Sequence, residues 1–198
     1  MNRAQFITRF QMSPLPPLED PLAAELGSHP KLRDAAVLIA LEEHDKQLHI
    51  LLTERTADMP THAGQIAFPG GKVDRGDASP FETAVRESWE EIGLPRNVIE
   101  HVGELAPFHT ISRFRVWPQI AFINAPFEPI LSEREVARLF RAPLQDFLDP
   151  QQRWRVPIKR RQGEHSVYFM PHQVWGATAA MLEQLVRQLG YGKAPVGP

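Results

Sequence analysis

Strand-length blocks of apolar residues recur along most of the chain. An almost continuous apolar run at Ala35–Leu41 and a β-like run at Leu48–Arg55 are separated by a short polar stretch. Two such runs around a short polar stretch are typical of a β-hairpin. We expect further strands at Gln65–Phe68, Ile99–Leu105, Val116–Ile123, Arg153–Ile158 and His165–Met170.

Helix signals are clearest after Ser79. A serine N-cap, a proline at the first helical position and a glutamate three residues after the cap are a helix start. Gly93 and Pro95 mark its end, so the pattern predicts a helix over Pro80–Ile92. We expect at most a short helix in Met1–Gln11 and a further helix capped by Ser132–Glu135. A final helix is expected where apolar residues recur at helical spacing from Trp175 to Leu189.

The mixture of elements indicates the fold class. Mostly antiparallel strands with segregated helices favour an α/β (α+β) protein, an α/β/α sandwich with a mixed, largely antiparallel sheet. Residues 1–32 are expected to be an N-terminal arm with a Pro-rich linker, and residues 33–190 a single domain. Residues 191–198 are expected to be a flexible C-terminal tail.

Composition limits the classes of partner. The chain has 198 residues, with 22 Lys and Arg against 24 Asp and Glu. Its net charge of −2 gives no overall electrostatic attraction to nucleic acid or an anionic membrane. Cysteine is absent, which excludes disulfides and thiolate metal sites and fits a reducing compartment. We expect a soluble, cytoplasmic protein with no nucleic-acid or membrane partner. The oligomeric state stays open, a homodimer included.

One stripe of the predicted 80–92 helix is acidic. It carries Glu87, Glu90 and Glu91 and no lysine, and like charges at this spacing repel by a few tenths of a kcal/mol per pair. A divalent cation such as Mg²⁺, which binds carboxylate oxygens, would relieve that repulsion. A solvated acidic face is the alternative. The opposite stripe holds Phe81, Val85, Ser88, Trp89 and Ile92.

The residues around the helix favour a site over a solvated face. The preceding segment Phe68–Gly71 ends in two glycines, whose backbone can approach a ligand closely. The carbonyl of Gly71 could complete the oxygen shell of a metal. Arg86 lies beside the acidic stripe, where it can pair with Asp77 or a neighbouring glutamate and hold the carboxylates in place.

These residues resemble a known family signature. Gly71, Asp77 and the run Arg86–Leu94 are similar to the Nudix box, Gly…Glu…Arg-Glu-x-x-Glu-Glu-x-Gly, of the Nudix hydrolases. Asp77 stands where the box has Glu, one extra residue precedes Arg86, and Ser88 replaces an aliphatic residue. The resemblance implies a Nudix-type α/β/α sandwich and a hydrolase that depends on Mg²⁺ or Mn²⁺.

A second motif narrows the resemblance. Leu51–Thr56 and His62–Gly71 are similar to the segment that marks the coenzyme A pyrophosphatase subfamily, and Val174–Ala179 resembles the start of its C-terminal helix. The similarity covers about Asp34–Leu189. It implies cleavage of the pyrophosphate of coenzyme A or its derivatives to 3′,5′-ADP and 4′-phosphopantetheine. Another Nudix substrate such as ADP-ribose, or a non-catalytic nucleotide-binding regulator, is the alternative.

Roles for single residues follow from the resemblance. Glu87 and Glu91 are the first metal ligands, with Glu90 as a further ligand or the general base and Gly71 as a carbonyl ligand. Glu90, Glu91 and Arg86 form the catalytic set. A coenzyme A-like nucleotide would contact Arg55, His62, Gln65 and Gly70.

Each substrate contact has a plainer alternative. Arg55 could be a solvated strand end, and His62 with Gln65 a pair that stabilises a turn. Many Nudix enzymes take a base or ligand from a carboxylate outside the box, which brings in Glu133 and Glu135. The alternative for Glu135 is an ordinary capping box after Ser132.

Overall fold

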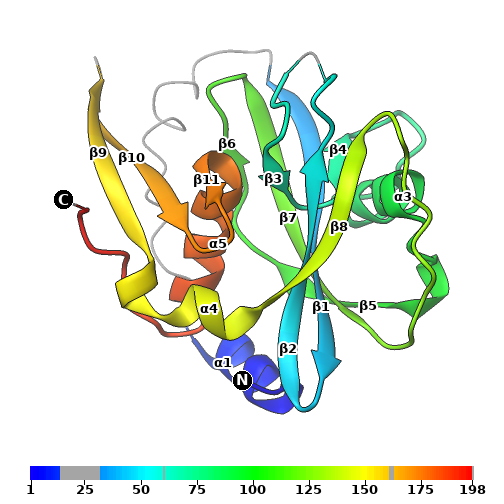
Figure 1. Ribbon diagram of the computed structural model, residues 1–198, viewed down its shortest axis with the longest axis horizontal. Helices are drawn as coiled ribbons and strands as arrows, with labels where there is room; N and C mark the ends of the chain where they lie inside the picture. Colours follow the sequence, from blue (N-terminus) through cyan, green and yellow to red (C-terminus); the bar gives the residue numbers. More distant parts are fainter. Residues whose placement is uncertain (14–31, 60, 161–162, 198) are drawn as a thin grey trace.

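The computed structural model describes residues 1–13, 32–59, 61–160 and 163–197 (Figure 1). The larger sheet contains β1 (Arg33–His44), β2 (Gln47–Arg55), β3 (Ile66–Ala67), β4 (Gly70–Lys72), β5 (Ile99–Glu104), β6 (Phe108–His109), β7 (Phe114–Ile123) and β8 (Val136–Pro143). The smaller sheet contains β9 (Trp154–Arg160), β10 (Gly163–Met170) and β11 (Val174–Trp175). The α-helices are α1 (Arg3–Met12), α3 (Pro80–Ile92), α4 (Leu144–Leu148) and α5 (Gly176–Gln188), and short 3₁₀ turns lie at Arg96–Val98 and Pro150–Gln152.

The larger sheet is mixed and largely antiparallel, as predicted. Its order is β3-β2-β1-β7-β5, with β4 paired to β1, β6 to β7 and β8 to β2. Strands β1 and β7 run parallel from Arg33↔Phe114 to Leu41↔Phe122, whereas β1 and β2 form the predicted antiparallel hairpin.

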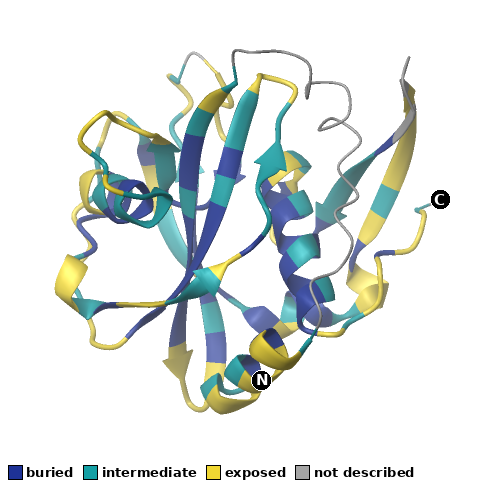
Figure 2. Cartoon of the chain, turned by 180° about the vertical axis from the view of Figure 1, so that it is seen from behind, coloured by how far each residue is buried: buried dark blue, intermediate teal, exposed yellow. Residues whose placement is uncertain are grey.

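Both faces of the larger sheet are covered, which explains the unbroken apolar run of β1. Leu38 and Ala40 pack with buried residues of α3, whereas Ile39 and Leu41 pack with α1, α4 and α5. A strand buried on both faces needs apolar residues at successive positions. Figure 1 shows α3 on one side of the sheet and α5 on the other, and Figure 2 shows the buried stripe of α5. The α/β/α arrangement is confirmed.

Helix α3 begins and ends where the sequence predicts. The Ser79 hydroxyl accepts a hydrogen bond from the Glu82 backbone N–H at 3.2 Å. At the other end Gly93 adopts φ +68°, and its N–H donates to the Trp89 carbonyl at 2.9 Å. Glycine adopts this left-handed conformation without a steric penalty, so the helix ends there.

The predicted helix after Ser132 is wrong. The N–H groups of Glu135 and Val136 donate to the Ser132 carbonyl at 3.0 and 2.9 Å in a tight turn, and β8 follows directly. Strand β8 pairs with β2 from Arg55↔Val136 to His49↔Pro143. A serine before acidic residues can begin a turn as well as a helix, and the long pairing with β2 decides the outcome.

Two tryptophans assigned to apolar helix stripes are exposed. Trp89 of α3 is 56% exposed, because the face of α3 that packs on the sheet is centred on Val85, Ser88 and Ile92. Trp175 lies in β11 opposite Phe169 and precedes α5, which begins at Gly176 with φ +66°.

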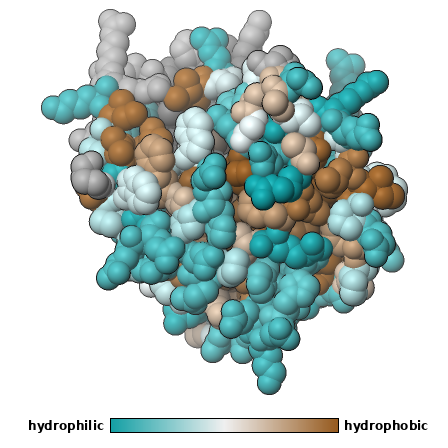
Figure 3. Space-filling model, in the orientation of Figure 1, coloured by the Kyte–Doolittle hydropathy of each residue, from teal (hydrophilic) through white to brown (hydrophobic). Residues whose placement is uncertain are grey.

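The smaller sheet has one covered and one solvent-facing side. Met170 and Val174 are buried with α5, whereas Val156 and Ile158 of β9 are exposed. Hydrophobic side chains reach the surface at the upper left of Figure 3, on the side where β9 and β10 lie.

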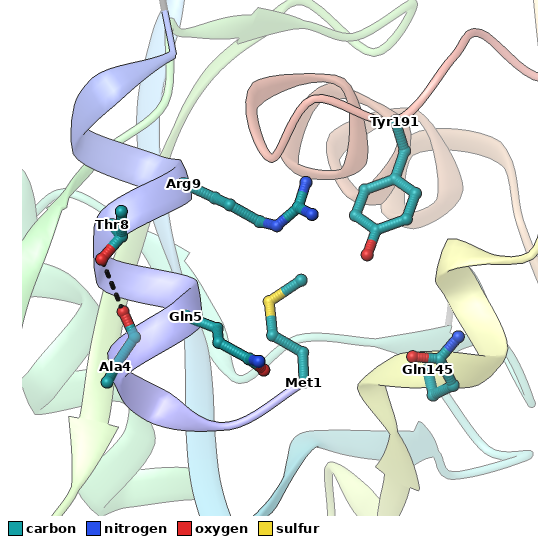
Figure 4. Close-up of a pocket in the computed structure, with 7 residues that line it drawn as sticks. All are labelled: Met1, Ala4, Gln5, Thr8, Arg9, Gln145 and Tyr191. Atoms are coloured by element: carbon teal, nitrogen blue, oxygen red, sulfur yellow. Dashed lines mark hydrogen bonds between the residues drawn. The ribbon is translucent and has the colours of Figure 1, made fainter.

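Both ends of the described chain pack on the domain. Phe6 and Phe10 of α1 are buried in the core, and Arg9 donates to the Leu189 carbonyl at 3.1 Å. Figure 4 shows Arg9 pointing toward Tyr191 across a cavity of about 520 Å³. In the segment predicted as a flexible tail, Ala194 is buried and the Pro195 carbonyl accepts a hydrogen bond from the Arg155 N–H at 2.9 Å.

The division into arm, domain and tail stays a prediction, and the predicted linker around Pro14, Pro16 and Pro17 lies outside the described residues. No helix within the described ranges is long and apolar enough to cross a lipid bilayer.

Candidate active site

Glu91 is a buried carboxylate at the contact between α3 and the glycine turn. It is 4% exposed, and its Oε2 accepts a hydrogen bond from the Gly70 backbone N–H at 3.1 Å. Burial raises the pKa of Glu91 to about 8, and the charges of Glu135 and Glu87 add to this shift. The Gly70 N–H and the Arg55 charge act in the opposite direction. Glu91 is therefore a desolvated carboxylate with two further carboxylates, Glu135 and Glu87, close enough to act on it.

Glu87 lies one helical turn before Glu91 and faces Gly71. A Cβ atom on residue 71 would collide with the Glu87 carboxylate, so glycine is required for this close approach. Burial raises the pKa of Glu87, as do the charges of Glu90 and Glu135, while Arg86 lowers it. The glycine turn thus lies close to two carboxylates of α3, with Gly71 facing Glu87 and Gly70 bonded to Glu91.

Glu90 belongs to a different environment. Its residue lies at the exposed edge of α3, with a side chain that is 54% exposed, and its Oε2 accepts a hydrogen bond from Arg86 at 3.1 Å. The three glutamates of the predicted acidic stripe are therefore not equivalent, because Glu91 is buried, Glu87 is half-buried and Glu90 faces solvent.

Arg86 connects the acidic helix to the loop before it. Its Nε and Nη2 donate to the two oxygens of Asp77 at 3.1 and 3.0 Å, and its Nη1 donates to Glu87 at 3.0 Å. Thr83 also donates to Asp77, at 2.8 Å. These bonds hold the pKa of Asp77 well below its usual range and raise that of Arg86. The predicted pairing of Arg86 with Asp77 and the glutamates is present.

Arg55, at the end of β2, has an unsatisfied guanidinium. Its Nε is buried and has no hydrogen-bond partner among the described residues, and its Nη2 has a weak contact with the Met59 sulfur at 3.9 Å. Its charge lowers the pKa of Glu91. A buried donor without a partner costs free energy, so Arg55 is well suited to an anionic ligand.

His62 and Gln65 contact each other in the loop between β2 and β3. The His62 Nδ1 lies 2.8 Å from the Gln65 Oε1, and His62 has φ +60°. The Gln65 carbonyl accepts a hydrogen bond from the Arg55 N–H at 3.0 Å, which fixes the loop to β2. Within the described residues, the hydrogen bonds of this pair stabilise the loop and do not reach the glutamates.

Glu135, which the sequence presents as a residue of a capping box, acts electrostatically on the glutamates of α3. It precedes β8, and its carbonyl accepts a hydrogen bond from the Thr56 N–H at 3.1 Å. Its charge raises the pKa of both Glu87 and Glu91, so it belongs to the same carboxylate group. The available signal was an acidic residue outside the box, but its spacing from Ser132 favoured a helix cap.

The donor chemistry of this group suits a hard divalent cation. Glu87, Glu91, Glu135 and the Gly71 carbonyl offer oxygen atoms, which Mg²⁺ and Mn²⁺ prefer. Repulsion from neighbouring carboxylates contributes to the raised pKa values of Glu87 and Glu91, and a bound cation would relieve that repulsion. Among the residues that the structure describes, no three His, Asp or Glu side chains are already gathered closely enough to hold an ion.

Comparison with known proteins identifies the family. The family model of the NUDIX domain matches residues 31–162. The chain belongs to the Nudix family. It is 40% identical over 187 residues to a Nudix hydrolase NudL of Pectobacterium atrosepticum, covering 93% of each chain, and 35% identical over 188 residues to a NudL of Escherichia coli, again covering 93% of each. Both relatives are named as uncharacterized Nudix hydrolases.

The solved structures support the Nudix fold. A Nudix hydrolase from Alicyclobacillus acidocaldarius aligns with a TM-score of 0.52 at 19% identity, covering 86% of this chain and 100% of that one.

The protein is an enzyme, a Nudix pyrophosphohydrolase, and its NudL relatives fit the subfamily resemblance.

The structure accounts for two departures from the Nudix box. Asp77, in place of Glu, still binds Arg86 through both carboxylate oxygens. Ser88, in place of an aliphatic residue, is buried, and its hydroxyl donates to the Ala84 carbonyl at 2.6 Å. Neither departure disturbs the glutamates.

Proposed function

We propose that this Nudix hydrolase cleaves the pyrophosphate of coenzyme A or its acyl derivatives to 3′,5′-ADP and 4′-phosphopantetheine or its acyl form. One observation carries the catalytic part. The pKa values of Glu87 and Glu91 are raised by burial and by neighbouring carboxylates, Glu135 among them, beside an Arg55 guanidinium whose buried Nε has no hydrogen-bond partner among the described residues. The assignment of coenzyme A as the substrate rests on the similarity of Leu51–Gly71 to the segment that marks the coenzyme A pyrophosphatase subfamily.

The metal is Mg²⁺ or Mn²⁺. Glu87 and Glu91 would hold it, with Glu90 and the Gly71 carbonyl as further oxygen donors. A bound divalent cation neutralises pyrophosphate charge and lowers the pKa of a water molecule. Arg86 acts as a positioning residue, because its bonds to Asp77 and Glu87 hold the Glu87 carboxylate and connect α3 to the loop before it.

Arg55 binds the pyrophosphate. A planar guanidinium matches two phosphate oxygens at once, and its buried Nε has no competing partner among the described residues. The Gly70 backbone, with His62 and Gln65 at the rim of the loop, completes the substrate contacts.

Two carboxylates are candidates for the general base. Glu90 is exposed and tied to Arg86, whereas Glu135 is half-buried and acts electrostatically on both Glu87 and Glu91. Comparing Glu90→Gln with Glu135→Gln assigns the role. Loss of the base lowers kcat and removes the acid limb of its pH profile, whereas loss of an outer ligand raises the metal concentration needed for half-maximal rate.

A hydrolysis panel tests the proposal. Coenzyme A, acetyl-coenzyme A, ADP-ribose and 8-oxo-dGTP are incubated separately with the protein in Mg²⁺ or Mn²⁺, and the products are identified by mass. We expect metal-dependent release of 3′,5′-ADP from the first two. Preferred hydrolysis of ADP-ribose or 8-oxo-dGTP would replace the substrate assignment, and binding without hydrolysis of any of them would favour a regulator.

A further inference from the structure

A second cavity of about 300 Å³ lies on the α5 side of the larger sheet, at the end of β2. It is lined by Glu54 of β2, Ile66 of β3, Arg138 and Phe140 of β8, and His172 and Gln173 of the turn between β10 and β11. Its volume is at the lower end of the range for small-molecule sites. Strand β3 contacts β11, which leads directly into α5 (Figure 1).

This cavity is next to the candidate active site along the chain. Glu54 precedes Arg55, and Ile66 follows Gln65, whose carbonyl accepts a hydrogen bond from the Arg55 N–H at 3.0 Å. Gly64, on the cavity rim, donates to the Arg55 carbonyl at 3.1 Å. The cavity and the carboxylates of α3 lie on opposite faces of the larger sheet, so a ligand whose phosphates lie at Arg55 has to extend around the end of β2 to place another group in this cavity.

The lining presents flat groups with polar edges. The Arg138 guanidinium lies 4.8 Å from the centre of the Phe140 ring, and its Nη2 lies 2.8 Å from a Glu54 carboxylate oxygen. The His172 ring lies 6.4 Å from the Phe140 ring, and its Nε2 lies 2.8 Å from an Asp146 carboxylate oxygen. The positive charge of Arg138 is thus balanced by Glu54, and the imidazole is fixed in place.

This chemistry selects among the parts of a nucleotide substrate. A phosphate requires surplus positive charge, which the Glu54–Arg138 pair does not leave. An acyl chain requires an apolar lining, which a carboxylate, a guanidinium and an amide interrupt. A heterocyclic base stacks on aromatic and guanidinium faces and hydrogen bonds along its edge.

We propose that this cavity binds the adenine base of the substrate, with Phe140 and Arg138 as its stacking surface and Glu54 and Gln173 at its polar edge. The proposal rests on the proposed function for the identity of the base. The larger cavity of about 520 Å³ is a weaker candidate, because its Arg9 already donates to Leu189 and lies 5.2 Å from the Tyr191 ring.

Binding of the two product halves tests the proposal. Dissociation constants for 3′,5′-ADP, which carries the base, and 4′-phosphopantetheine, which does not, are measured by calorimetry in Mg²⁺. We expect Phe140→Leu to weaken 3′,5′-ADP binding about tenfold or more and phosphopantetheine binding less than twofold, while Phe140→Tyr keeps both within about threefold. Thermal unfolding of each variant confirms that it is folded.

A second pair of variants, at two arginines, tests the proposal if Phe140→Leu does not fold. Arg138→Gln removes the guanidinium from the cavity, and Arg134→Gln removes an exposed arginine that does not line it. We expect only Arg138→Gln to weaken 3′,5′-ADP binding several-fold. Equal loss for both ligands, unchanged 3′,5′-ADP binding, or no binding of 3′,5′-ADP by the wild type would overturn the proposal.

The test of the adenine site and the test of the proposed function can give different outcomes. If coenzyme A is not hydrolysed but 3′,5′-ADP binding depends on Phe140, the substrate assignment fails and the base site stands. If coenzyme A is hydrolysed but the Phe140 and Arg138 variants bind 3′,5′-ADP like the wild type, the base site fails and the proposed function stands.

Discussion

The carboxylate of Glu91 accepts a hydrogen bond from the backbone N–H of Gly70 at 3.1 Å, and the side chain that makes this bond is almost fully buried. The bond fastens the acidic helix to the glycine turn. Burying a carboxylate beside two others costs free energy, because both desolvation and repulsion disfavour its charged form. A protein tolerates that cost where the charge has a use, and under the proposed function that use is to attract a cation.

Glu91→Gln is expected to lower turnover about 10²–10³-fold, since losing one such electrostatic group costs about 2.7–4 kcal/mol of transition-state stabilisation. The metal-free variant should be as stable as the wild type or slightly more so, because an amide oxygen can still accept from Gly70 while the charge is gone. Steady-state rates at saturating Mg²⁺ and urea unfolding in a chelator measure the two effects.

Glu82→Gln is the matched control, because Glu82 lies on the same helix, is paired with Arg96 and is remote from the carboxylate group. It should keep turnover within about twofold. Near wild-type turnover of Glu91→Gln would show that the metal assignment is wrong.

Gly71→Ala is expected to abolish most activity without large loss of stability. The added methyl group would occupy the space of the Glu87 carboxylate and displace it. Gly76→Ala is the control, since a Cβ there meets nothing within 4 Å. Turnover and metal affinity of the two variants are compared, and equal behaviour would contradict the close approach of Gly71 and Glu87.

Asp77→Asn is expected to destabilise the protein by about 1.5–3 kcal/mol at neutral pH, the usual contribution of a hydrogen bond to a charged group. Arg86 holds the pKa of Asp77 well below its usual range. The stabilisation is therefore complete above the unfolded-state pKa of about 4 and is lost as the pH falls through the lower native-state pKa.

The difference in unfolding free energy between wild type and Asp77→Asn should accordingly shrink below about pH 4. Urea unfolding from pH 7 to pH 2 measures it, with Asp58→Asn, an exposed substitution, as the control. A difference that stays constant across this range would contradict the role of the Asp77–Arg86 pair.

Arg55→Lys is expected to lower kcat/KM at least tenfold with little change in stability. Lysine keeps the positive charge but cannot contact two phosphate oxygens in one plane. The loss should be in kcat/KM for pyrophosphate substrates and absent from the unfolding curve. A wild-type kcat/KM in this variant would show that Arg55 does not bind the pyrophosphate and is only a solvated strand end.

The fold could be predicted where local signals and long-range packing agree. The run Ala35–Leu41 gave a central strand, and Ser79 with Gly93 gave both ends of α3. Prediction failed at Ser132, where the same residues suit a helix cap and a turn, and only the pairing of β8 with β2 decides between them. That pairing joins segments about 85 residues apart and leaves no local trace.

The candidate site could be predicted as a set of residue types but not as a set of environments. Helical spacing placed Glu87, Glu90 and Glu91 on one stripe, yet the chain around Ser132 covers Glu91, with the Ser132 N–H donating to its carbonyl at 2.9 Å. Glu90 stays in solvent. Glu135 joins the carboxylate group only because the turn before β8 returns to α3, which sequence spacing does not reveal.

In the proposed reaction these carboxylates act on the pyrophosphate of coenzyme A. A competition assay tests it most directly: coenzyme A and ADP-ribose at equal concentration in one tube with Mg²⁺, with both products quantified by mass spectrometry over the initial phase. The ratio of product formation gives the ratio of kcat/KM. We predict a ratio well above one in favour of 3′,5′-ADP and 4′-phosphopantetheine, abolished together with all turnover in Glu91→Gln, whereas a ratio below one would contradict the account.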